Sequence, residues 1–166
     1  MRALVGREFG TELVSVPIAL SDIRKWALAV YYPDVPPRLF WDEAYARATR
    51  HRGIVAPEDF NPFAWFTADG PVMAPNYVGP VRNSGPEAAV GIAPPETTFM
   101  LNGGIAVTYG VRMRPDDVIT ASRNKVVDYQ ERPSRHGLML LTWTESTWTN
   151  QNADMVKTTR RATIRY

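Results

Sequence analysis

The sequence has 166 residues, of which 45% are hydrophobic, 22% charged and 11% aromatic, a composition that is typical of a globular domain and excludes a mainly disordered chain. No apolar run approaches the roughly 20 residues that cross a bilayer, and 19 basic against 17 acidic residues are too balanced for a nucleic-acid binder. There is no cysteine, and the two histidines, His51 and His136, are far apart. We therefore expect one cytoplasmic domain over residues 1–166, with neither a metal nor a cofactor.

Two helices are predicted in the first third of the chain. Ser21 has the side chain of an N-cap, and apolar residues at helical spacing follow it over 23–30, before Pro33 ends the helix. Asp42 is the N-cap of the second helix, which carries cationic residues in its last turn and Gly53 as its C-terminal cap. The prolines between the two helices predict a structured loop.

Residues 53–97 differ from the rest of the chain, because they hold eight of the 14 prolines and only six charged residues. Within them, Asn61 and Pro62 favour a short helix that runs through Phe66. A segment of this length without regular structure is usually functional. Because its large apolar side chains are costly to leave in water, we expect it to border a pocket and to pack on a sheet or on a partner.

The last third of the chain is rich in β-forming residues. After a short strand at 13–16, we predict four antiparallel strands at 105–112, 118–130, 138–148 and 156–166, joined as a meander. Arg114-Pro115-Asp116-Asp117 is the turn between the first two. Helices followed by antiparallel strands indicate an α+β fold, in which helix covers one face of the sheet.

Four segments resemble the MaoC-like dehydratases, in particular the group described as the N-terminal or FAS1-like dehydratase domain. They are SDIRKWA at 21–27, WDEAYARA at 41–48, RGIVAP at 52–57 and the turn RPDDVI at 114–119. The resemblance implies a hot-dog fold, in which a curved antiparallel sheet wraps around a helix, and the hydration of 2-enoyl thioesters or the reverse dehydration. The Pro/Gly-rich segment 53–97 stands where the family has its central helix. We expect residues 63–68 or 87–93 to form a shortened version of that helix.

The resemblance also shows a degraded catalytic motif. Catalytic members carry Gly-Asp-x-Asn-Pro-x-His, whose aspartate and histidine hold the attacking water. Aligned on Asp42, Phe40 stands at the histidine position, and Asp34 lies one residue out of register with the aspartate. Asp34 is either a lone catalytic carboxylate or the cap of a turn. We interpret His51 as a surface residue at a helix end and His136 as a turn residue, so neither replaces the missing histidine.

Two groups of side chains are candidates for substrate binding. Aromatic residues either form the core or line a wide acyl pocket, namely Tyr31, Tyr32, Phe40, Trp41, Phe63, Trp65 and Phe66. Arg160 and Arg161 either contact the phosphates of coenzyme A or form a solvated strand face.

The leading hypothesis is a non-catalytic, substrate-binding subunit of a heteromeric enoyl-CoA hydratase or 3-hydroxyacyl dehydratase acting on a bulky or long acyl group. A catalytic MaoC-like hot-dog subunit would then be its partner, in a heterodimer or a dimer of heterodimers, with an acyl-CoA or acyl-carrier-protein thioester as substrate. The alternatives are a self-sufficient dehydratase, also as a homodimer, that uses a carboxylate such as Asp34, and a non-enzymatic acyl-thioester binding module.

Overall fold

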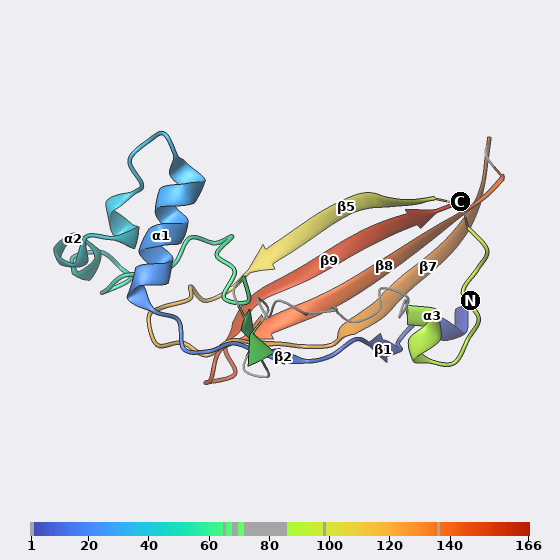
Figure 1. Cartoon of the computed structure of the whole chain (residues 1–166), viewed down its shortest axis with the longest axis horizontal. Helices are drawn as coiled ribbons and strands as arrows, with labels where there is room; N and C mark the ends of the chain where they lie inside the picture. The colour runs from blue at the N-terminus through green and yellow to red at the C-terminus, as the bar shows by residue number, and fades with distance from the viewer. Residues whose placement is uncertain (1, 65, 68–69, 72–85, 98, 136) are drawn as a thin grey trace.

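The computed structural model describes residues 2–64, 66–67, 70–71, 86–97, 99–135 and 137–166. Four long antiparallel strands dominate the fold and twist along their length (Figure 1). These strands are β5 (Met100–Tyr109), β7 (Asn124–Ser134), β8 (Gly137–Thr149) and β9 (Met155–Arg165). Helices α1 (Leu20–Tyr31) and α2 (Glu43–Arg47) lie beyond one end of the strands, and the short α3 (Pro86–Ala89) lies near the other end. None of the helices formed by the described residues is long and apolar enough to cross a membrane.

The remaining elements are short. The strands of two residues are β1 (Glu8–Phe9), β2 (Leu13–Val14), β3 (Phe66–Thr67), β4 (Gly70–Pro71) and β6 (Thr120–Ala121), and the 3-10 helices are η1 (Arg2–Leu4) and η2 (Arg38–Phe40). β1 pairs with β7, β2 pairs with β6, and β6 pairs with the end of β8, so these elements extend the main sheet. In the part of the chain that the structure describes, β3 and β4 pair only with each other.

The strand order corrects part of the predicted meander. β7, β8 and β9 are consecutive neighbours, but β5 pairs with the other edge of β9. The turn at 114–117 therefore does not join adjacent strands. The reason is that the chain after β5 pairs with the N-terminal segment, since Ile18 N donates to Asp117 O (2.9 Å) and Ser15 N donates to Ile119 O (2.8 Å). The β8–β9 turn is local, because Asn150 Oδ1 accepts hydrogen bonds from two backbone amides within it.

The bounds of the helices differ from those that the sequence predicts. α1 begins after Ala19, and Ser21 lies inside it without capping it. Asp42 does cap α2, but this helix ends at Arg47, where the Thr49 hydroxyl donates to the carbonyl of Ala46 (2.7 Å) and competes with the helical bond. The predicted helix from residue 61 to 66 is instead a turn, in which the Asn61 side chain accepts from Phe63 N (3.0 Å) before β3 begins.

The hydrophobic core lies at the end of the sheet where α1 and α2 meet the strands. It consists of Ile18, Ile23, Ala27, Phe40, Ala46, Ile54, Val55, Ala56, Phe60, Met113, Ile119 and Val156. Burial of these side chains therefore mainly stabilises the contact between the helices and the strand ends. These residues cover little of the sheet itself.

The inner face of the sheet is defined here as the face that carries Thr142 and Trp148 on β8. At one end of it, the ring of Phe63 packs edge-on against Trp148, with centroids 4.9 Å apart. At the other end, Glu87 of α3 contacts Arg165. An antiparallel sheet with a helix on one face confirms the predicted fold class. α3 overlaps the predicted range 87–93, although it begins at Pro86 and forms only about one turn.

Candidate functional site

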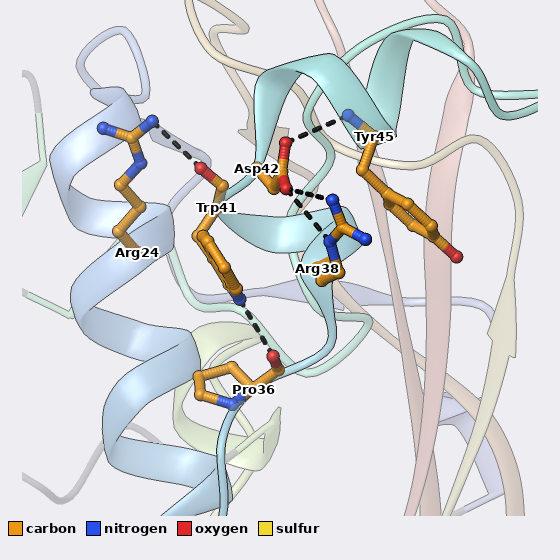
Figure 2. A network of polar contacts seen from close by, with 6 residues as sticks. All are labelled: Arg24, Pro36, Arg38, Trp41, Asp42 and Tyr45. Atoms are coloured by element: carbon orange, nitrogen blue, oxygen red, sulfur yellow. Dashed lines mark hydrogen bonds and ion pairs between the residues drawn. The ribbon is translucent and has the colours of Figure 1, made fainter.

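The loop that would carry the catalytic motif is closed by a polar network (Figure 2). Trp41 Nε1 donates to the carbonyl of Pro36 (2.9 Å), and Arg24 donates to the carbonyl of Trp41 (3.1 Å). Asp42 accepts from the backbone N–H of Tyr45 (3.0 Å) and from Arg38 (2.7 Å). These two contacts, in that order, hold the pKa of Asp42 below its usual value. The side chains around the degraded motif thus fix the loop and the start of α2.

The structure separates the two residues that align with the catalytic pair. Phe40 is only 4% exposed and packs in the core against Tyr31, with ring centroids 5.9 Å apart. Asp34 is exposed, and its backbone N–H donates to the carbonyl of Tyr31 (2.7 Å), which closes a turn after α1. Because a phenyl ring has no hydrogen-bonding atom, Phe40 cannot hold a water for Asp34.

His51 lies in a cleft of about 650 Å³ and not at a helix end, because α2 stops before it. Burial, and then the nearby Arg50, Arg112 and Arg114, lower the pKa of His51. Arg114 also donates to the carbonyl of His51 (2.8 Å). An imidazole held among guanidinium groups is kept neutral near pH 7. His136 lies outside the described residues.

The predicted aromatic wall is not gathered in one place. Tyr31 packs against the core, Tyr32 is exposed, and Trp41 lines a separate apolar cleft of about 360 Å³ beside α1. Phe63 contacts Trp148 on the inner face. Trp65 and residues 72–85 lie outside the described residues, as does the side chain of Phe66.

Arg160 and Arg161 lie on opposite faces of the sheet, because they are neighbours in β9. Arg160 is opposite Glu145 in the register, whereas Arg161 is opposite Thr144 on the inner face. The two guanidinium groups are therefore not positioned to grip one phosphate together. Arg161 shares its face with Arg165, four residues further along the strand.

The sequence did not predict a pocket on the inner face beside α3. This pocket has a volume of about 270 Å³ and is lined by Phe9, Pro86, Met100, Asn124, Thr142, Thr144, Arg161, Thr163 and Arg165. Beneath it, Arg165 Nη2 lies 2.5 Å from Glu87 Oε1 and 3.4 Å from the Thr142 hydroxyl. The alternating hydroxyl side chains of β8, such as Thr142 and Thr144, are the sequence pattern that could have indicated this pocket. Nothing local points to Glu87, which is 78 residues from Arg165.

The family of this chain is known from comparison with protein-family models. Residues 3–159 match the family described as the FAS1-like dehydratase domain region. The chain belongs to this family. The predicted MaoC-like relationship is thereby confirmed, and with it membership of the hydratase and dehydratase group of hot-dog proteins. No curated protein matches the sequence significantly.

Solved structures with the same fold include two complexes and one hydratase. The ChsH1-ChsH2 complex from Mycobacterium tuberculosis has a TM-score of 0.65 and 17% identity, over 95% of this chain and 83% of that one. The HadBC (3R-hydroxyacyl-ACP dehydratase) complex from the same organism has a TM-score of 0.58 and 14% identity, over 97% of this chain and 96% of that one. R-hydratase PhaJ1 from Pseudomonas aeruginosa has a TM-score of 0.54 and 13% identity, over 96% of this chain and 79% of that one. At these identities the similarity shows the fold alone.

Proposed function

We propose that this chain is the substrate-binding, non-catalytic subunit of a heteromeric enoyl-thioester hydratase or 3-hydroxyacyl dehydratase. The observation that carries the proposal is the burial of Phe40 in the core, at the position where a catalytic family member has its histidine. General base catalysis needs a proton acceptor beside the reacting water, and Phe40 supplies none. A catalytic MaoC-like partner would contribute the aspartate and the histidine.

The exposed strand β5 supports the need for such a partner. Every residue of β5 is exposed, including large apolar side chains such as Ile105, which is 55% exposed. Among the described residues, β5 pairs with β9 along one edge, and no strand pairs with its other edge. A long edge strand with exposed apolar side chains favours association, because the backbone groups of its outer edge are available to pair with another chain. Two similar structures, ChsH1-ChsH2 and HadBC, are complexes.

The inner face supports a role in holding the acyl group. Among the described residues, its cover consists of the Phe63 turn and the single turn of α3, at opposite ends. Next to α3, the inner face carries a pocket of about 270 Å³. Such space fits a bulky or long acyl group, with Arg161 as a candidate contact for the phosphate of coenzyme A or of an acyl carrier protein.

Enzyme assays of the chain alone, of a catalytic MaoC-like protein alone and of the two co-expressed test the proposal. The substrates are crotonyl-CoA and trans-2-decenoyl-CoA. We expect no hydration by the chain alone, and a complex that hydrates decenoyl-CoA faster than the partner alone does.

Two other outcomes would overturn this assignment. Hydration by the single chain that is lost in Asp34→Asn would show a self-sufficient enzyme. Thioester binding without faster turnover in any mixture would show a binding module.

A further inference from the structure

The cleft around His51 contains three arginines, of which only one forms an ion pair among the described residues. The cleft has a volume of about 650 Å³ and is lined by residues from the segments that follow α2 and β5 and from the β8–β9 turn. Arg112 pairs with Glu58 (2.5 Å). Arg50 and Arg114 have no carboxylate partner within the described part of the chain. Both of these arginines are exposed and line the cleft, so a ligand from solution reaches their guanidinium groups.

The other two carboxylates of the cleft accept hydrogen bonds from other groups. Asp117 is 7% exposed and accepts from the backbone N–H of Arg114 (2.8 Å) and from Gln151 Nε2 (3.0 Å). Asp154 accepts from Asn150 Nδ2 (3.1 Å) within the β8–β9 turn. Neither carboxylate forms an ion pair with an arginine that lines the cleft.

His51 holds the two unpaired guanidinium groups next to each other. Arg50 Nε donates to His51 Nε2 (3.4 Å), and Arg114 Nη2 donates to the carbonyl of His51 (2.8 Å). The remaining N–H groups of both side chains stay available. Because a guanidinium group has donors and no acceptor, a ligand that binds both must supply acceptor atoms. A negative charge on those atoms strengthens each hydrogen bond.

The electrostatics at His51 agree with an anionic ligand. Burial lowers the pKa of the imidazole first, and the charged groups that then lower it are Arg50, Arg112 and Arg114. The potential at the imidazole is therefore positive, although the cleft is lined by as many carboxylates as arginines. An anion bound here would reduce the repulsion among the three guanidinium groups.

The size of the cleft indicates what kind of anion fits. A phosphate group has several outer oxygens, and guanidinium groups bind such oxygens through paired N–H groups. The cleft is larger than one phosphate needs, and Asn150 and Asn152 add amide groups that both donate and accept. Pockets of this volume hold organic ligands. These features favour a phosphate ester of an organic molecule.

We propose that this cleft binds the phosphate group of a phosphate monoester, which accepts hydrogen bonds from Arg50 and Arg114 beside His51. The site is separate from the inner-face pocket, because no residue lines both. The inference therefore does not rest on the proposed function and is tested without it. Two sources offer the same chemistry, namely the 3′-phosphate of coenzyme A and a separate small ester such as a nucleoside monophosphate.

Titration of the full-length chain with inorganic phosphate tests the site. NMR follows the imidazole of His51 at fixed pH and about 0.15 M ionic strength, where interactions between distant exposed charges are largely screened. We expect saturable binding at least about tenfold tighter than that of chloride, because phosphate accepts more charge-assisted hydrogen bonds. Arg50→Gln and Arg114→Gln should each weaken phosphate binding about fivefold or more. Arg47→Gln, which changes an exposed arginine of α2 that pairs with Glu43, is the matched control.

Thermal unfolding of the free variants separates binding from folding. Arg114→Gln can lower the melting temperature, because the Arg114 side chain also holds the segment that contains His51. Arg50 contacts only its neighbour His51, so Arg50→Gln should melt with the parent and is the decisive variant. Saturation with phosphate should also raise the pKa of His51, since a bound anion offsets the guanidinium charges.

Displacement of phosphate by larger ligands identifies the source of the phosphate group. Coenzyme A that competes at least about tenfold better than dephospho-coenzyme A, which lacks the 3′-phosphate, would identify the thioester carrier. Competition by AMP, with no difference between the two coenzymes, would identify a separate ester.

Three results would overturn the inference. Phosphate that binds no more tightly than chloride would show only screening of surface charge. Phosphate binding that is unchanged in Arg50→Gln would place the anion elsewhere. Failure of AMP and of both coenzymes to displace phosphate would exclude an organic ester from the cleft.

Discussion

The buried ion pair between Glu87 and Arg165 should contribute strongly to the stability of the chain. The side chains of Glu87 and Arg165 are 1% and 13% exposed, so water screens their interaction little. Removing one member of such a pair leaves an uncompensated buried charge and costs about 3–5 kcal/mol. We therefore expect Arg165→Leu to lower the free energy of unfolding by this amount. For a chain of this size, the loss corresponds to a fall of about 6–20 °C in Tm.

Guanidinium-induced unfolding of a double-mutant cycle measures the effect. Glu87→Leu should cost a similar amount, whereas the double variant should cost much less than the sum, because both charges then leave the interior together. Arg47→Leu provides the matched control, since the pair Arg47–Glu43 spans 3.3 Å with side chains 72% and 53% exposed. This control should change stability by less than about 0.5 kcal/mol.

A small effect would refute the reasoning. If Arg165→Leu costs less than about 1 kcal/mol, the pair is not desolvated in the way its burial indicates. If the double variant costs as much as the two single variants added together, the two charges do not interact, and α3 is held on the sheet by other contacts.

Three further predictions concern the edge strand, the cleft histidine and the core. Ile105→Lys should abolish association with a catalytic partner, measured by light scattering, without unfolding the chain, because the side chain is already exposed; an unchanged complex would exclude β5 from the interface. The pKa of His51 is lowered by burial and by neighbouring arginines, so the unfolded chain takes up the proton first, and stability should fall as the pH drops below the ordinary value of 6.5. His51→Gln should remove this dependence in unfolding titrations, and an unaltered pH profile would contradict the assignment. Phe40→His should give no hydratase activity and cost about 1–3 kcal/mol, since a polar ring would enter the apolar core; a stable, active variant would contradict that placement.

Local patterns in the sequence were sufficient for several elements. The β-rich runs predict β8 and β9 to within one residue at each end, because alternation and turn residues act over a few positions. The strand predicted at 118–130 is instead divided into β6 and β7, and β7 continues to Ser134. The Asn150–Asp154 turn and the Asp42 cap were predicted for the same reason, since their hydrogen bonds span at most four residues. The four segments that resemble the dehydratases pointed to the correct family.

Long-range contacts decided what the sequence did not. Pairing of β5 with β9 depends on the segment after β5 binding the N-terminal strand, which no local periodicity encodes. Phe40 packs into the core while Asp34 stays exposed, because α1, α2 and the strand ends meet around Phe40. The Glu87–Arg165 pair joins residues 78 positions apart. Its energy depends on burial by the completed fold, and only the tertiary structure places it on the inner face beside Tyr129.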